Sequence, residues 1–147
     1  MKEPTTSTLV LAVADIAGFS RACRHKFDVG TFAMLDRFYH ATADVIATSG
    51  GSLVKSMGDA VLMVFPEEKA KQAASCLQEL QDRVQTVWSE FGTECTVRIH
   101  AHFGTVAAGP IGPAQQFDIV GNPVNELFLM PWDGPMFSEE MTRLINK

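Results

Sequence analysis

The chain has 147 residues, of which 46% are hydrophobic and 20% are charged, and its formal net charge is −5. This is the composition of a globular protein with one sizeable core, and we expect a single domain over residues 1–147. The acidic balance argues against a nucleic-acid partner and against contact with an anionic membrane surface.

The cysteines favour a reduced, cytoplasmic setting. Cys23, Cys76 and Cys95 are odd in number and widely spaced, and they form neither a CxxC pair nor a zinc pattern. The apolar run near the N-terminus is interrupted by Asp15 and is too short to span a membrane, which argues against a signal peptide or an anchor.

Residues 9–20, LVLAVADIAGFS, predict a buried strand followed by a small loop, because the run is rich in valine and leucine and stops at glycine. A carboxylate at the end of such a strand, Asp15, is costly to bury unless a cation meets it. Next to it, Gly18 allows backbone N–H groups to form an anion-binding concavity. This stretch alone leaves two interpretations of Asp15 open: a metal ligand, or the cap of the helix that follows.

Residues 31–48 predict a helix, ended by Gly50 and Gly51. Residues 52–66 predict two short strands joined at Gly58 and Asp59, a dipeptide that favours tight turns. The expected apolar face of the helix consists of Phe32, Leu35, Phe38, Tyr39, Thr42, Val45 and Ile46.

Residues 67–91 predict a long helix laid on a sheet, and residues 97–103 alternate like a half-buried strand. Arg98, His100 and His102 share the more polar face of that strand. The two histidines could bind a metal together, but two histidines on a polar sheet face is the favoured interpretation, since no third ligand lies nearby.

The remaining segments are short. Residues 104–113 predict a loop around a short apolar strand, and residues 116–120 a further strand with one acid. Asn122 is expected to cap a short helix that begins with Pro123 and ends at Pro131, and Ser138 to begin a last helix over residues 139–145. This order predicts an α/β (α+β) fold: a ferredoxin-like sandwich with a mixed or antiparallel sheet covered by helices.

Asp59, on the hairpin turn, is the second carboxylate of interest. Asp15 and Asp59 both lie at strand ends of one predicted sheet. If their strands are neighbours, the two carboxylates can share a pair of magnesium ions, as in sites of in-line phosphoryl displacement. The alternative is that Asp59 is a turn residue selected for its backbone conformation.

Four segments occur in an order that is similar to the class III nucleotide cyclases, the adenylyl and guanylyl cyclase catalytic domains. They are DIAGFS at 15–20, KSMGDAVLMVF at 55–65, VRIHAHFGTVAAGPIG at 97–112 and FDIVGNPVN at 117–125. The likeness blurs beyond residue 125, although MFSEEMTRLI resembles the family's S-E-x-T helix. The resemblance therefore implies a cyclase-homology domain.

The resemblance also implies the ligands of the metals and the phosphates. Asp15 and Asp59 match the two metal-binding aspartates, with the carbonyl of Ile16 as a further ligand of two Mg²⁺ or Mn²⁺ ions. The loop whose backbone cradles the triphosphate corresponds to Ala17, Gly18, Phe19 and Ser20.

For the nucleoside, Lys55 and Asp118 match the pair that reads the purine, and Asn125 matches the asparagine that orients the ribose. A lysine donor and a carboxylate acceptor suit adenine, whereas guanylyl cyclases resemble this pattern with Glu and Cys there. In this family two subunits pack head to tail, and the metals come from one chain while the purine pair and the asparagine come from the other. A homodimer that binds ATP is implied.

Two departures from the family pattern stand out. The transition-state arginine of the family falls four residues after the asparagine, where this chain has Leu129. Residues four apart share a helical face, so Leu129 is expected to point where Asn125 points. The chain also stops at Lys147, where cyclases usually continue into a hairpin with a phosphate-binding lysine.

Two functions therefore follow from the sequence. One is an adenylate cyclase, a phosphorus–oxygen lyase that makes cyclic AMP and pyrophosphate slowly because a cation is missing. The other is a catalytically inactive cyclase-homology domain that binds nucleotide or acts as a regulatory module.

Overall fold

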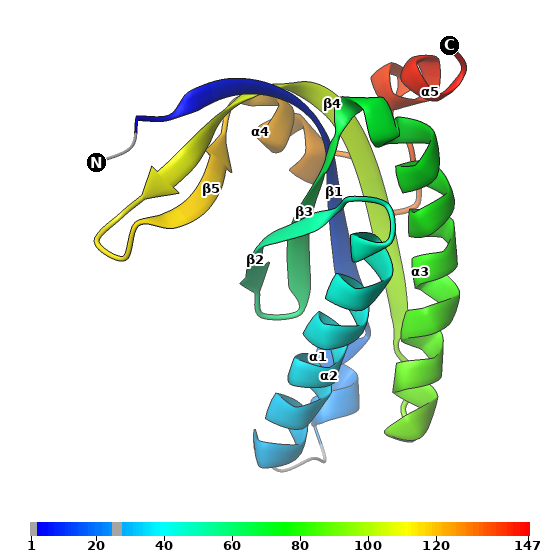
Figure 1. Ribbon diagram of the computed structural model, residues 1–147. Coiled ribbons are helices and arrows are strands. Elements are labelled where there is room, and N and C mark those ends of the chain that lie inside the picture. The colour runs from blue at the N-terminus through cyan, green and yellow to red at the C-terminus, as the bar shows by residue number, and fades with distance from the viewer. Residues whose placement is uncertain (1–2, 25–27) are drawn as a thin grey trace.

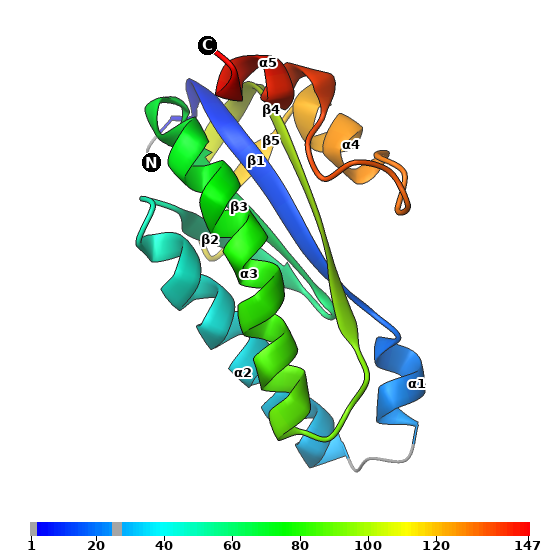
Figure 2. The same ribbon diagram turned by 90° about the vertical axis from the view of Figure 1, so that its right-hand side faces the viewer.

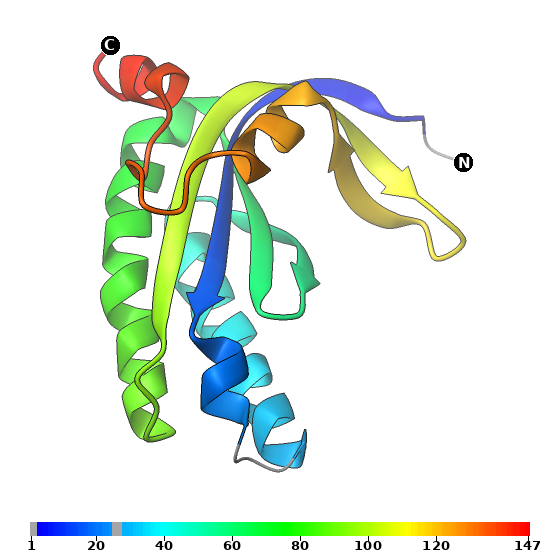
Figure 3. The same cartoon turned by 180° about the vertical axis from the view of Figure 1, so that it is seen from behind.

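The computed structural model describes residues 3–24 and 28–147, and its centre is a five-stranded sheet with the strand order β2-β3-β1-β4-β5. Each pair of neighbouring strands is antiparallel. Two long helices, α2 and α3, cover one face of the sheet, and the shorter α4 lies on the other (Figures 1, 2 and 3). The predicted sandwich of helices on an antiparallel sheet is confirmed.

The strand β1 (Thr5–Ala17) is the middle of the sheet and pairs with β3 (Ala60–Pro66) and β4 (Thr96–Ile111). Its alternate side chains enter two hydrophobic clusters, one on each face. Val10, Ala12 and Ala14 face α2 and α3, while Leu11 and Val13 face the side of α4. Because both faces are covered, the strand is a continuous apolar run rather than an alternating one.

The predicted hairpin is confirmed. The strand β2 (Ser52–Met57) turns through Gly58, whose φ of 66° lies in the left-handed region, and Asp59 into β3. A register shift between Leu53 and Lys55 interrupts the ladder. Irregularities of this kind bend an edge strand and re-aim its side chains.

The two long helices are α2 (Asp28–Ala47) and α3 (Ala70–Glu90); α3 follows a single 3-10 turn, η1 (Glu67–Lys69). A short helix, α1 (Phe19–Cys23), follows β1. The placement of Phe32 on the core face is wrong, since this residue is 75% exposed. The first turns of α2 extend past the end of the sheet, and the buried positions are Met34, Phe38, Thr42, Val45 and Ile46 (Figure 1).

The predicted loop over residues 104–113 is wrong, because β4 continues through it to Ile111 and pairs with β5 (Gln116–Val120). The glycines that indicated a turn serve close approach instead. A Cβ at Gly104 would lie 2.5 Å from Cγ of Pro123 in α4, and one at Gly109 would lie 3.0 Å from Cα of Pro4.

The last two helices are α4 (Asn122–Phe128) and α5 (Glu139–Ile145). The predicted cap of α4 is wrong by one residue, since Gly121 occupies that position and Asn122 is already helical. The cap of α5 is confirmed: Ser138 Oγ accepts the Met141 N–H at 3.1 Å. Among the described residues, no helix combines the length and apolar character needed to cross a membrane.

Candidate active site

Asp15 and Asp59 lie at the same end of the sheet. Asp15 pairs with Ala60, the residue directly after Asp59, and the Ile16 N–H donates to the Asp59 carbonyl oxygen at 2.9 Å. The strands β1 and β3 are neighbours, as the shared-metal interpretation requires. The pairing therefore brings together two carboxylates that are far apart in the sequence.

The surroundings of the Asp15 carboxylate disfavour its charged form. Partial burial raises its pKa, and the Asp59 carboxylate raises it further; the Arg98 guanidinium and the Ile16 backbone N–H act in the opposite direction. Asp15 is not a helix cap, because Gly18 occupies the N-cap position of α1 and no side-chain cap bond forms there. A divalent cation between the carboxylates would relieve this repulsion.

The carboxylates of Asp15 and Asp59 suit a metal ion that is also coordinated by the phosphates of a substrate. No group of three or more His, Cys, Asp or Glu side chains with metal-binding geometry occurs within 3–24 and 28–147. Mg²⁺ in nucleotide sites needs only one or two protein carboxylates, since water and substrate phosphates complete its shell. The interpretation of His100 and His102 as a metal pair finds no third ligand there.

The loop expected to cradle phosphate forms the turn between β1 and α1. Ala17 ends the strand, Gly18 has a φ of 82°, and Phe19 and Ser20 begin the helix. A left-handed φ of this size favours glycine. A cavity of about 420 Å³ lies beside Gly18 and is also lined by Arg21, which adds a cation to this end of the molecule.

Lys55 and Asp118 are brought together from opposite edges of the sheet. The Lys55 Nζ donates to Asp118 Oδ2 at 3.0 Å, and the other carboxylate oxygen accepts the Ile119 N–H at 2.7 Å. One oxygen is thus oriented by its own strand while the other meets the lysine. The pair offers one donor and one acceptor on a partly exposed surface.

Asn125 is exposed on α4, and Leu129 lies one turn further along. The Leu129 N–H donates to the Asn125 carbonyl oxygen at 3.1 Å, the bond of residues four apart in a helix. The expectation that the two share a face is confirmed. The Leu129 side chain is 81% exposed and is therefore not part of the core.

Comparison with known proteins identifies the family to which this chain belongs. Residues 1–130 match the family model described as the adenylate and guanylate cyclase catalytic domain. The chain belongs to this family. It is 32% identical over 110 residues to an adenylate cyclase of Streptomyces coelicolor, and 25% identical over 118 residues to adenylate cyclase 2 of Rhizobium meliloti. These matches cover 71% and 76% of this chain, but only 29% and 32% of the relatives.

Solved cyclase structures share the fold. The adenylyl cyclase CyaB from P. aeruginosa superimposes with a TM-score of 0.87 at 18% identity, over 99% of this chain and 83% of that one. The guanylyl cyclase Cya2 gives a TM-score of 0.86 at 20% identity, over 99% and 82%. At this level of identity the likeness concerns the fold.

Two features of this cyclase domain were not recognised in the sequence. Arg98 lies directly opposite Asp15 in the β1–β4 register, and His100 and His102 are both buried rather than on a polar face. The alternation of residues 97–103 put these side chains on one face, but their neighbours depend on strand pairing over more than eighty residues of chain. The helix α4 and residues 131–138 cover that face (Figure 3). The sequence of residues 97–103 alone does not indicate this cover.

Proposed function

We propose that this domain converts ATP into 3′,5′-cyclic AMP and pyrophosphate at the interface of a head-to-tail homodimer. The 3′ oxygen of the ribose would lose its proton to water and form a bond to the α-phosphorus, while the bond from the α-phosphorus to the bridging oxygen of the β-phosphate would break and release pyrophosphate. Asp15 and Asp59 would hold two Mg²⁺ or Mn²⁺ ions with the Ile16 carbonyl. When bound, such ions supply charge neutralisation at the attacking and leaving oxygens.

The observation that carries the adenine assignment is the Lys55–Asp118 contact at 3.0 Å. In place of this contact, the lysine would donate to a ring nitrogen of adenine and the carboxylate would accept from its amino group. A purine with the opposite donor and acceptor pattern would leave both groups unpaired, at about 1–3 kcal/mol each.

The other side chains have binding and orienting roles. The N–H groups of Ala17, Gly18, Phe19 and Ser20 would bind the triphosphate at the end of β1. Asn125, from the other subunit, would hold the ribose so that its 3′ oxygen lies in line with the α-phosphate. A homodimer would have two such sites, each with the metal and phosphate ligands of one subunit and the nucleoside-binding residues of the other.

Leu129 sets the expected rate. An apolar side chain at this exposed position provides no charge for the transition state, and the loss of one such group costs about 10² to 10³ in rate. The same observation supports the second candidate, a nucleotide-binding module without catalysis.

One assay distinguishes the two. Cyclic nucleotide formation is measured from each of the four NTPs with Mn²⁺ or Mg²⁺, alongside nucleotide binding. Cyclic AMP from ATP supports the enzyme, whereas metal-dependent ATP binding without any cyclic product would contradict it and favour the binding module.

A further inference from the structure

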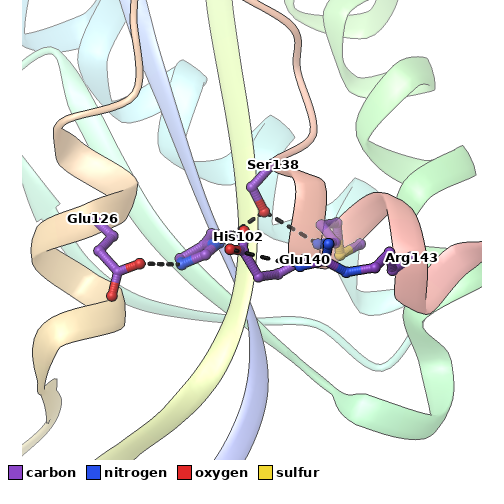
Figure 4. A network of polar contacts seen from close by, with 6 residues as sticks. His102, Glu126, Ser138, Glu140 and Arg143 are labelled. Carbon is purple, nitrogen blue, oxygen red and sulfur yellow. Dashed lines mark hydrogen bonds and ion pairs between the residues drawn. The ribbon is translucent and has the colours of Figure 1, made fainter.

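His102 contacts two short helices, through Glu126 of α4 and through Ser138, the N-cap residue of α5. It lies on β4 opposite Leu11, on the face that α4 and the segment before α5 cover, and is only 4% exposed. Its Nδ1 lies 2.7 Å from Ser138 Oγ, and its Nε2 lies 3.3 Å from Glu126 Oε2 (Figure 4). Buried polar atoms are costly unless paired, and both ring nitrogens have partners here.

The chemical nature of each partner determines which group donates in these hydrogen bonds. An ionised carboxylate only accepts, so Nε2 carries a proton and donates to Glu126. When the ring is neutral, Nδ1 accepts from the Ser138 hydroxyl, and when the ring is protonated, Nδ1 donates to Ser138 Oγ, so the contact is satisfied in either form. Ser138 Oγ in turn accepts the Met141 N–H at 3.1 Å. The result is a continuous relay from α5 through β4 to α4.

The Ser138 end of this relay is firmly held. The Ala101 N–H donates to the Met136 carbonyl oxygen at 2.8 Å, and the Ser138 N–H donates to the Ala101 carbonyl oxygen at 3.0 Å. These bonds fix the start of α5 to the strand residue next to His102. Glu140 and Arg143 add charge here, with Glu140 Oε2 3.7 Å from His102 Nδ1 and its Oε1 3.9 Å from the Arg143 guanidinium.

The Glu126 end, by contrast, is on a short helix that packs on the sheet through apolar side chains, among them Pro123 against Gly104 and the partly buried Val124. The helix α4 has seven residues, no side-chain cap, and one buried residue, Leu127. A helix this short is unstable without tertiary contacts. Leu127 anchors it to the core, and the His102–Glu126 bond is a second anchor about 100° around the axis. Apolar packing holds α4 on the sheet, and the added polar anchor at Glu126 restricts its rotation and therefore the direction of Asn125, the preceding residue.

We propose that His102 is a positioning residue, which holds α4 and with it Asn125 through its hydrogen bonds to Glu126 and Ser138. The consequence for catalysis rests on the cyclase function proposed above. Misplacement of a substrate-orienting group by about 1 Å can cost about a hundredfold in rate. The role of His102 is thus to keep Asn125 directed at the ribose, without touching the nucleotide.

The test uses Glu126→Ala, because the Glu126 side chain is 57% exposed and its removal leaves the core intact. We expect kcat to fall about ten- to a hundredfold, with KM changed by less than about twofold. Glu126→Gln keeps an oxygen acceptor for Nε2 and should recover most of kcat. Glu139→Ala, which removes an exposed carboxylate from the adjacent helix, is the matched control and should leave kcat unchanged.

Two further measurements separate positioning from other roles. Hydrogen exchange of residues 122–130 should become faster in Glu126→Ala, while that of α3 should not change. In an Asn125→Ala background, Glu126→Ala should cause no additional loss of kcat, because residues that act as a unit are non-additive. Unchanged exchange in α4, unchanged kcat, or full additivity with Asn125→Ala would each overturn the proposal.

The outcomes also separate this inference from the proposed function. If the unmodified protein forms no cyclic nucleotide, the cyclase function fails. The exchange of residues 122–130 then still decides whether His102 holds α4 through Glu126.

Discussion

The Lys55 ammonium and the Asp118 carboxylate form an ion pair at 3.0 Å, although β2 and β5 are the two opposite edges of the sheet. The distal half of β4 bends away from α2 and α3 and carries β5 toward β2 (Figure 1). Both side chains keep contact with solvent, and exposed ion pairs contribute only about 0–1 kcal/mol to stability. The pair therefore contributes little to folding, which is compatible with the role in purine recognition that we propose for it.

The first prediction concerns purine selectivity. ATP should bind better than GTP, and Lys55→Glu combined with Asp118→Cys should narrow or reverse this preference, since each mismatched polar contact costs about 1–3 kcal/mol. Competition between the two nucleotides for the metal-loaded protein measures it. Lys71→Glu, which repeats the charge change of the Lys55→Glu substitution on an exposed face of α3, is the control. Equal competition by GTP with the unmodified protein would contradict the assignment.

The second prediction concerns the metal ions. Mg²⁺ or Mn²⁺ with a non-hydrolysable ATP analogue should raise the melting temperature, because a ligand at 100 times its Kd stabilises the folded state by about 2.7 kcal/mol. Asp15→Ala and Asp59→Ala should each abolish the metal-dependent part of this shift. If both variants respond to metal like the unmodified protein, these residues are not the ligands.

The third prediction follows from the raised pKa of Asp15, caused by burial and by Asp59. Between the unfolded pKa of about 3.8 and the higher folded pKa, the folded state holds more protons, so stability falls as pH rises through this interval. Without metal, Asp15→Asn should therefore melt at a higher temperature than the unmodified protein at pH 7. This advantage should shrink toward zero as the pH falls to about 3.8.

Thermal denaturation in a chelator across this pH range measures the effect. Asp44→Asn, on an exposed position of α2, should show no such advantage. A melting temperature of Asp15→Asn that is equal or lower at pH 7 would contradict the electrostatic account.

Where strand or helix periodicity was unambiguous, the sequence predicted the element well. The strand around Val10 and the hairpin at Gly58 were predicted correctly, and so was the capping of α5 by Ser138. The prediction failed at Gly104, because a glycine required for close packing against Pro123 has the same local signal as a glycine in a turn. Only the tertiary arrangement distinguishes these two cases.

The candidate site was likewise predicted only in part from the sequence. The motifs picked out Asp15 and Asp59, and strand pairing puts them at one end of the sheet. The surroundings of His102 were not predictable, because its partners Glu126 and Ser138 come from segments that fold back over β4. A polar residue in an alternating strand is predicted to be exposed, and the sequence of the strand does not show whether another element covers it.

The last prediction concerns Leu129, where the chain departs most from the family pattern. Its N–H donates to the carbonyl oxygens of Asn125 and Glu126 at 3.1 and 3.2 Å, and its side chain is 81% exposed. Leu129→Arg should therefore fold normally and place a guanidinium on the face that carries Asn125. That group is always charged, and its geometry matches phosphate oxygens.

Negative charge accumulates on the phosphoryl oxygens more in the transition state than in the ground state, so the gain should appear in turnover rather than in affinity. We expect Leu129→Arg to raise the Mn²⁺-dependent rate about tenfold or more, with little change in nucleotide binding. Phe128→Arg adds the same charge about 100° around α4 and should give no such gain. The melting temperature and the rate of both variants are measured together. A folded Leu129→Arg variant without a higher rate would mean that the site lacks more than one cation, and the binding module would then be the better interpretation.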